Sequence, residues 1–375
     1  MNQPPPAADG AASSQPTAPA GAGRAHHGDD DARGATIDFA VNVRSTRPPA
    51  ALEEALAAEL PRLGAYPDRH RLAAATAAIA ARLGVPAERT LLLSGASEGF
   101  ALLPALLRRG LVVHPGFSEP EDALRAQGVP TRRIVLPAPW DGAALEGALA
   151  AAPPRAGDGL IIGNPTNPTG RAFDPELLAR LAGPGLLIVD EAFADVSPGV
   201  SSALPLAAAR ERVLVLRSLT KTFALAGLRC GVAVGHPDLL AALAARRPHW
   251  PLSSLQLAAV EWAAQVADEH YATIAQQAAE EKAALLAALA PFGITAACPS
   301  AAPYVLVRLP WPPEVCRAVR ERLRARGVAV RRCDTFPGLG EQYWRLAARG
   351  ADAREGLVAA LRHIVDAPPR PGQYD

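Results

Sequence analysis

Short apolar runs alternate with helical patterns from residue 90 to residue 235, and this alternation restricts the folds open to the chain more than any other feature. The runs show little polar alternation, which is typical of parallel strands with helices on both faces. The segments between them have helical spacing and end at glycine, as βαβ units do. The sequence therefore predicts an α/β fold with a doubly wound, mostly parallel sheet of seven strands, built from TLLLSG, LVVHP, RRIVL, GLIIGNP, GLLIVDEAF, VLVLRSL and CGVAVG.

The pattern changes after residue 235, which indicates a second and smaller α+β domain. A long helical stretch is followed by short strand-like runs and two further helical segments. The first 34 residues are rich in Pro, Ala, Gly and Ser and contain no Phe, Trp or Tyr, so they are predicted to be disordered. The predicted organisation is an arm (1–34), a segment joining the small domain (35–60), a large domain that contains the sheet (61–250), a long helical connection (251–290), a small domain (291–366) and a tail (367–375).

Composition favours a small-molecule ligand over a nucleic acid or a membrane. The formal net charge of +1 leaves no basic excess for a polyanion, and no uninterrupted apolar run is long enough to span a bilayer. The cysteines are far apart and no secretory apolar segment precedes them, which favours reduced thiols in the cytoplasm. His26 and His27 precede three aspartates, but in a polar arm this cluster is predicted to be solvated rather than to bind a metal.

Polar and glycine-rich segments follow four of the predicted strands. In open α/β sheets, ligands bind beyond the carboxyl ends of the strands. The four strand ends should therefore meet at one rim of the sheet. This rim is predicted to be a single ligand site, made of residues 95–97, 164–170, 190 and 218–221.

Lysine is almost absent, because only two of the 38 basic residues, Lys221 and Lys282, are not arginine. A guanidinium stays protonated, whereas a desolvated lysine amine can lose its proton and form a Schiff base with a carbonyl group. Lys282 lies in a polar helical run and is predicted to be a solvated surface residue. Lys221 follows an apolar strand at the predicted rim, which makes it the candidate nucleophile.

A Schiff-base lysine points to pyridoxal 5'-phosphate, which needs an anion near its ring nitrogen, cover for its ring face and a phosphate cradle. Asp190 can supply the anion, Asn167 a hydrogen bond to the ring, and Phe117 the cover. Each also has an ordinary structural alternative, namely a helix cap, a turn residue and a core aromatic. The predicted phosphate cradle combines Ala96, Ser97, Ser218, Thr220 and Arg229.

The segment SLTKTFALAGLRCG, with NPTNPTG and DEAF before it, resembles the fold-type-I, class I and II aminotransferases. The resemblance runs from about residue 38 to residue 361. It implies that Lys221 forms the internal aldimine with pyridoxal phosphate and that Asp190 keeps the pyridine nitrogen protonated. It also implies a homodimer in which Tyr66 reaches the cofactor phosphate of the neighbouring subunit. The substrate, an amino acid or amino-acid phosphate, would be bound by Asn42, Arg331 and Arg345.

Two branches of this family are most similar to the chain: the histidinol-phosphate aminotransferases and the threonine-phosphate decarboxylases of cobalamin side-chain assembly. Phe193 stands where the first branch usually has tyrosine, whereas RRCDTFPGL, HHGD and DFAVN resemble the second, above all an actinobacterial cobalamin subgroup. Decarboxylation is therefore expected slightly ahead of transamination. Arg44, Arg47 and Arg332 depart from the decarboxylase pattern; the first two either bind a substrate phosphate or lie on the surface.

Two other classes of protein fit part of the sequence. GASEG has the spacing of the α/β-hydrolase elbow, with Ser97 as nucleophile and with Asp190 and a later histidine such as His236 as partners. Only one predicted strand precedes this motif, which disfavours the hydrolase. A non-catalytic cofactor-binding regulator would carry an added DNA-binding domain, for which the 34-residue arm is too short.

Overall fold

The described part of the chain begins with a short helix. The computed structural model describes residues 27–365, so most of the expected arm, His26 and the expected tail lie outside the described residues. Helix α1 (Gly28–Ala32) falls within the arm, and here the structure differs from the expected disorder. The helix is held to the small domain because Asp31 forms a buried ion pair of 3.2 Å with Arg331, a contact that spans most of the sequence.

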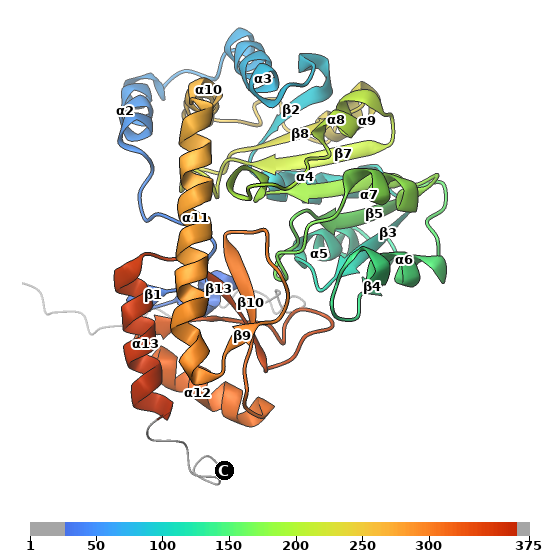
Figure 1. Cartoon of the computed structure of the whole chain (residues 1–375). Helices are drawn as coiled ribbons and strands as arrows, with labels where there is room; N and C mark the ends of the chain where they lie inside the picture. The colour runs from blue at the N-terminus through green and yellow to red at the C-terminus, as the bar shows by residue number, and fades with distance from the viewer. Residues whose placement is uncertain (1–26, 366–375) are drawn as a thin grey trace, which may run out of the picture.

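A seven-stranded sheet forms the centre of the large domain, as predicted (Figure 1). Its order is β2-β8-β7-β6-β5-β3-β4. Neighbouring strands from β7 to β4 are parallel, and β8 runs antiparallel to both of its neighbours. The strands coincide with the seven apolar runs: β2 (Thr90–Leu93), β3 (Arg109–His114), β4 (Thr131–Val135), β5 (Asp158–Gly163), β6 (Leu186–Glu191), β7 (Val213–Ser218) and β8 (Gly231–Gly235).

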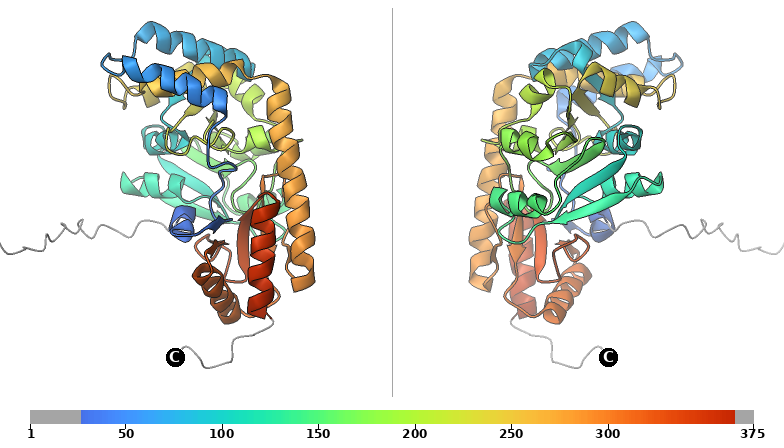
Figure 2. Two further views of the ribbon diagram at one scale, coloured as in Figure 1. Left: turned by 90° about the vertical axis from the view of Figure 1, so that its left-hand side faces the viewer. Right: turned by 90° about the vertical axis from the view of Figure 1, so that its right-hand side faces the viewer.

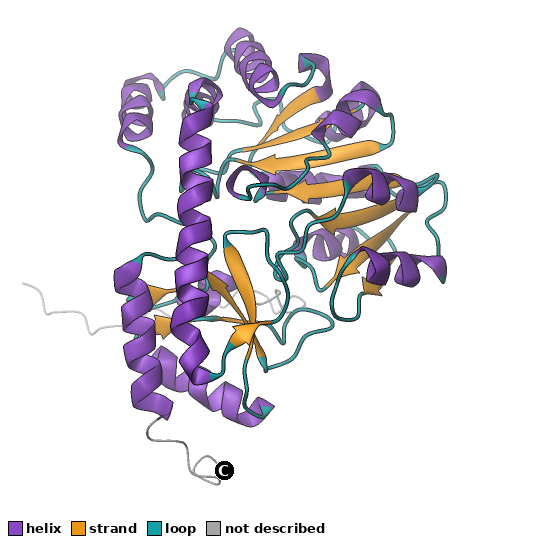
Figure 3. Ribbon diagram, in the orientation of Figure 1, coloured by secondary structure: helices purple, strands orange, loops and turns teal. Residues whose placement is uncertain are grey.

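Helices cover both faces of this sheet (Figure 3), so its inner strands carry apolar side chains on both sides. Along β6, Leu187 and Val189 pack into one core, and Leu186 and Ile188 pack into the other. This two-sided burial is the physical reason for the unalternated apolar runs. The first core is covered by α6 (Gly142–Ala150), α7 (Pro175–Ala182) and α8 (Leu204–Ala209), and the second by α4 (Ala96–Leu102), α5 (Glu119–Ala126) and α9 (Pro237–Ala244).

Three helices pack together beside the β2 edge of the sheet, at the top of Figure 1. Arg71, near the start of the second of these helices in the chain, lies between two carboxylates and forms ion pairs of 2.8 Å with both Glu59 and Glu261. One guanidinium therefore ties all three helices together. They are α2 (Ala50–Glu59), α3 (Arg69–Leu83) and α10 (Ser254–Gln265).

The segment 35–60, expected to join the small domain, is divided between the two domains. β1 (Ile37–Asp38) pairs in parallel with β11 (Val328–Ala329) of the small domain. Helix α2 instead packs on α10 of the large domain. Sequence periodicity does not reveal this division, because the position of α2 depends on its contacts with α10, about 200 residues later in the chain.

The helical connection expected over residues 251–290 consists of two helices. Val266 and Ala267 adopt extended backbone conformations after α10, and α11 (Asp268–Leu289) then begins with two acidic residues, which the positive end of a helix favours. Helix α11 runs beside both domains (Figures 1 and 2). Within residues 27–365, no helix has the length and apolar character needed to cross a membrane.

The small domain is built on an antiparallel sheet of order β12-β13-β10-β9. Lys282 of α11 donates hydrogen bonds to the carbonyl oxygens of Ser300 and Ala302, the second at 2.9 Å. Lys282 is thus a link between α11 and this domain, not the solvated residue expected. The elements are β9 (Thr295–Ala296), β10 (Tyr304–Arg308), α12 (Pro313–Ala325), β12 (Arg331–Arg332), β13 (Tyr343–Ala347) and α13 (Ala351–Val365).

Candidate active site

A cavity of about 440 Å³ opens at the carboxyl ends of β5, β6 and β7, between the two domains. The structure brings together at this cavity the residues that the sequence analysis drew from separate strand ends, together with Asn42 and Arg345 from outside the large domain. The predicted site residues that line the cavity are Asn42, Ala96, Ser97, Phe117, Asn167, Asp190, Ser218, Thr220, Lys221, Arg229 and Arg345. Tyr66 and Arg331 are not among its lining residues.

Lys221 and Asp190 lie at the ends of neighbouring strands. Burial and, to a lesser extent, the guanidinium groups of Arg345 and Arg229 together lower the pKa of Lys221 to about 8. Burial raises the pKa of Asp190 to about 7, although its carboxylate accepts a hydrogen bond of 3.0 Å from the Ala192 N–H. Near neutral pH, Lys221 therefore gives up its proton readily, and a cationic ring nitrogen placed beside Asp190 would hold that side chain as the carboxylate.

The turn between β2 and α4 places Ser97 against Arg229, which lies just before β8. Arg229 Nη2 donates a hydrogen bond of 2.6 Å to Ser97 Oγ. Gly95 makes this approach possible: its φ is +79°, and a Cβ built on it would lie 2.8 Å from Arg229 Nη2. At the end of β7, the Thr220 N–H donates a hydrogen bond of 3.2 Å to Ser218 Oγ. A guanidinium and hydroxyl groups thus converge at one end of the cavity, as a phosphate cradle requires.

Polar groups at the domain interface are left without protein partners. Arg345 is 5% exposed and donates to Asn167 Oδ1 at 2.8 Å and to the carbonyl oxygen of Ala40, but its Nε has no hydrogen-bond partner. Both amide atoms of Asn42, which is 8% exposed, also lack partners. Because unpaired buried polar atoms are costly, these groups indicate a polar ligand that would satisfy them.

Arg331 lies in a smaller recess of about 110 Å³ that adjoins the main cavity. His27, Phe117, Asn167 and Arg345 line both spaces. Arg331 pairs with Asp31 of α1, as described above, and also donates a hydrogen bond of 2.9 Å to Thr335 Oγ1. Its predicted contact with substrate stays a prediction, but its position next to Arg345 is compatible with it.

Besides Asp29, two ionisable side chains at the cavity were not assigned to the site from the sequence, His27 and Glu119. His27 was expected to be solvated, but its ring lies 5.7 Å from that of Phe117. Burial raises the pKa of Glu119, against the opposing effects of His27 and of a hydrogen bond with Ser97. The HHGD motif was a signal for the first residue, and the position two residues after Phe117 was the only signal for the second.

Tyr66 is 74% exposed and stacks on Trp250, with ring centroids 4.1 Å apart. It lies outside the cavity of its own chain, so its predicted role across a subunit interface stays a prediction. The three arginines that depart from the decarboxylase pattern are also absent from the cavity wall. Arg44, Arg47 and Arg332 each form an ion pair instead, with Glu281, Glu53 and Asp334, respectively.

The hydrolase alternative is not assembled in the structure. Ser97 Oγ accepts the hydrogen bond from Arg229 described above. His236 begins α9, where its Nδ1 accepts a hydrogen bond of 3.3 Å from the Asp238 N–H, and it does not line the cavity. His236 is therefore not placed to act as the base for Ser97.

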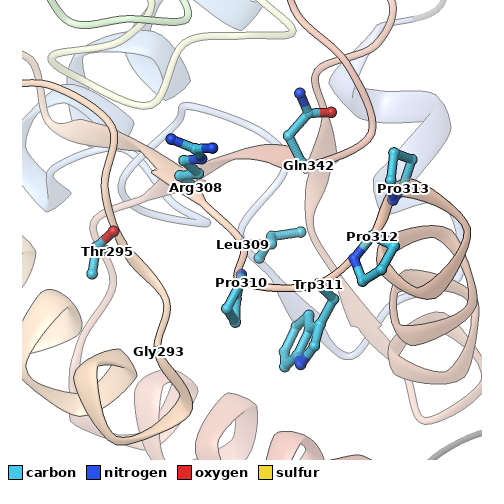
Figure 4. A pocket seen from close by; sticks show the side chains of 9 residues that line it. All are labelled: Gly293, Thr295, Arg308, Leu309, Pro310, Trp311, Pro312, Pro313 and Gln342. Atoms are coloured by element: carbon cyan, nitrogen blue, oxygen red, sulfur yellow. The ribbon is translucent and has the colours of Figure 1, made fainter.

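A larger cavity, of about 560 Å³, lies on the surface of the small domain (Figure 4). None of the predicted site residues lines it. Arg308 is its one charged lining residue, and four of the others are Trp311 and the neighbouring prolines. A single exposed charge without an acid or base beside it provides no catalytic group, so this cavity is not the candidate active site.

Comparison with known proteins identifies the family. The sequence profile described as aminotransferase class I and II matches residues 35–361. The chain belongs to this family. A histidinol-phosphate aminotransferase of Mycobacterium tuberculosis is 43% identical over 344 residues, which are 90% of each chain. A threonine-phosphate decarboxylase of Salmonella typhimurium is 33% identical over 346 residues, which are 88% of this chain and 91% of that protein.

Solved structures of this family share the fold. The histidinol-phosphate aminotransferase of Sinorhizobium meliloti, determined in complex with pyridoxal 5'-phosphate, superimposes with a TM-score of 0.78 at 20% identity. The similarity covers 91% of this chain and 95% of that one. The fold is therefore fold type I, as predicted, and the protein is an enzyme that uses pyridoxal 5'-phosphate.

The residues of the cavity fit this cofactor. Lys221 is the one lysine at the cavity, and its lowered pKa favours the amine that attacks an aldehyde. Asp190 would face the ring nitrogen, and Arg229 with Ser97 and Ser218 would bind the phosphate. The unpaired atoms of Asn42 and Arg345 remain for a substrate.

Proposed function

We propose that the protein decarboxylates a small amino-acid phosphate of the threonine-phosphate type, in cobalamin side-chain assembly, with Lys221 and Asp190 as its catalytic residues. The Salmonella relative named above supports this assignment of the reaction. Phe193 supports it as well, because it contributes an apolar ring to the cavity where the aminotransferase branch usually has a tyrosine hydroxyl.

The observation that carries this proposal is a pair of buried arginines that share one recess. Arg345 and Arg331 are 5% and 4% exposed and both line the space of about 110 Å³ beside Asn167. Two guanidinium groups fit a compact dianion such as a phosphate, which they can bind through paired hydrogen bonds. Asp31 already pairs with Arg331, so we expect α1 to shift when such a group enters.

The position of the phosphate would decide which bond of the substrate breaks. When bound, pyridoxal phosphate withdraws electrons from the substrate's α-carbon, and the bond perpendicular to its ring is the one that is weakened. If Arg331 and Arg345 hold the phosphate, the α-carboxylate is free to take the perpendicular position and leave as CO2. Lys221, with its pKa near 8, can then return a proton to the α-carbon.

Transamination is the second candidate, and the relative of higher identity, from Mycobacterium tuberculosis, supports it. In this alternative Arg345 would bind the α-carboxylate of glutamate or 2-oxoglutarate in a bidentate pair, and the phosphate of histidinol phosphate, which has no carboxylate, in the other half-reaction. The α-C–H bond would then be the one weakened by the bound cofactor, and Lys221 would accept its proton. The same arginine thus serves either reaction, depending on which anion it holds.

Product analysis distinguishes the two reactions. The purified protein, loaded with pyridoxal phosphate, is incubated with threonine phosphate and, separately, with histidinol phosphate plus 2-oxoglutarate. Release of CO2 with formation of aminopropanol phosphate supports the decarboxylase. Formation of glutamate in the second incubation, without CO2 in the first, contradicts it and supports the aminotransferase.

We also infer a homodimer in which Tyr66 completes the site of the neighbouring subunit. Tyr66 and Trp250 form an exposed aromatic pair, and Leu60 and Leu63 expose apolar surface in the same stretch of chain. Exposed apolar surface of this kind is typical of an interface between proteins. Light scattering should give the mass of a dimer, and a monomer at micromolar concentration would contradict the inference.

The four cysteines are buried and unpaired, which suits the reducing cytoplasm.

A further inference from the structure

Arg217 and Glu191 lie opposite each other in the ladder between β6 and β7. Each directly adjoins a residue of the cavity wall, since Asp190 precedes Glu191 and Ser218 follows Arg217. Successive side chains of a strand point to opposite faces. The pair therefore lies behind the cavity wall, and neither of its members lines the cavity.

The Arg217–Glu191 pair is buried, and both oxygens of the Glu191 carboxylate accept hydrogen bonds. Arg217 Nη1 lies 2.8 Å from Glu191 Oε2, and the glutamate side chain is 0% exposed. Glu191 also accepts hydrogen bonds of 2.6 Å from Ser202 Oγ and from the Ala203 N–H. A carboxylate with this set of donors has one well-defined position, and the strand end that carries Asp190 is fixed with it.

The second arm of the Arg217 guanidinium reaches the loop after β6. Its Nη2 pairs with Asp195, in the short 3₁₀ turn η4 (Ala194–Val196). Asp195 in turn lies 3.4 Å from Thr222 Oγ1, which donates to its carboxylate, and Thr222 directly follows Lys221. One guanidinium thus connects the segment that carries Asp190 with the segment that carries Lys221.

We propose that Arg217 is a positioning residue that fixes the separation of Asp190 and Lys221 by bridging Glu191 and Asp195. Its planar fork can hold two carboxylates at once, which the single ammonium of lysine cannot do in the same geometry. The proposal rests on the cofactor roles proposed above for Lys221 and Asp190. Arg217 would touch neither the cofactor nor the substrate, but it would set the relative positions of Asp190 and Lys221.

The test is the Arg217→Lys variant of the full-length protein loaded with pyridoxal phosphate. We expect the dissociation constant of the cofactor to rise about ten-fold, as for the loss of a group that orients a site residue. We also expect the visible circular dichroism of the bound cofactor to weaken, because this signal depends on how the ring is held. The far-ultraviolet spectrum should match that of the wild type.

The matched control is Arg109→Lys. Arg109 and Asp158 also face each other on neighbouring strands and are joined by two hydrogen bonds, but at the amino ends of β3 and β5, away from the cavity. This variant should lower the melting temperature without changing either cofactor signal. If Arg217→Lys changes only the melting temperature, or if both variants change the cofactor signals equally, Arg217 is merely structural and the proposal is wrong.

Thr222→Val keeps the proposal testable if Arg217→Lys does not fold. It removes one hydroxyl from the Asp195 contact and leaves the arginine pairs in place. A smaller change of the same cofactor signals supports the proposal, and unchanged signals contradict it. These readouts involve no substrate, so an error in the proposed reaction would not affect them, whereas a wild-type protein that binds the cofactor at another lysine would refute the site itself.

Discussion

Replacing Arg345 by methionine should lower kcat/KM a few hundred-fold while leaving the protein folded. Arg345 is buried in β13 and reaches the cavity from the small domain. Methionine has a similar length but neither charge nor hydrogen-bond donors. The variant therefore removes the group that would bind the substrate anion, and the two hydrogen bonds of Arg345 to Asn167 and to the Ala40 carbonyl are lost with it.

The effect on stability is the difference of two opposing contributions. Burial lowers the pKa of Arg345 to about 10, which corresponds to about 3 kcal/mol against the charged form, and methionine relieves this cost. The two lost hydrogen bonds to a charged donor contribute about 3–6 kcal/mol together. The free energy of unfolding should therefore fall by no more than about 3 kcal/mol, within the stability of an ordinary domain.

The loss of activity is not offset by the relief of the burial cost that limits the loss of stability. A substrate anion left in a buried site without its arginine loses about 3–4 kcal/mol, or a few hundred-fold in kcat/KM. Arg349→Met is the control, because Arg349 donates to the carbonyl oxygens of Asp38 and Val41 but does not line the cavity. Steady-state kinetics should separate the two variants; equal losses of kcat/KM, or full activity of Arg345→Met, would refute the assigned role.

Three further predictions concern the same site. Uptake of pyridoxal phosphate by the apoprotein should accelerate as pH rises through about 8, because burial lowers the pKa of Lys221 and only its neutral amine attacks; a rate independent of pH would contradict this. Asp190→Asn should weaken the visible band and lower kcat about 100-fold, the scale for loss of a fixed charge at a reacting group. Mixed dimers of inactive Lys221→Arg and Tyr66→Phe chains should regain about a quarter of wild-type activity if Tyr66 acts across the interface, and none if it acts within its own chain.

The sheet and most of the site could be predicted because both follow from local sequence. Strands buried on both faces leave unalternated apolar runs, as in Leu186–Glu191, and the residue at the end of each run reaches the rim that holds the ligand. Asp190 and Lys221 are placed by this rule alone. Their separation is not, since it depends on how the two strands pair.

The remaining features depend on contacts between distant parts of the chain. Helix α1 forms where composition favours disorder because Asp31 meets the buried Arg331, and His27 is brought to the cavity with it. Helix α2 packs in the large domain instead of the small one, because Glu59 forms an ion pair with Arg71, which also pairs with Glu261 of α10. Lys282 is partly buried because its amine donates hydrogen bonds to carbonyl groups about 20 residues later in the chain. None of these contacts leaves a periodic signal in the sequence.

The measurement that tests the central claim most directly is a peptide map of the protein after borohydride reduction with bound pyridoxal phosphate. The reduced cofactor stays attached to the lysine that holds it, and mass spectrometry then identifies the modified peptide. The structure predicts a single modified peptide that contains Lys221, uncleaved by trypsin at that residue. Modification at Lys282, or no modification of a protein that still turns over its substrate, would contradict the account.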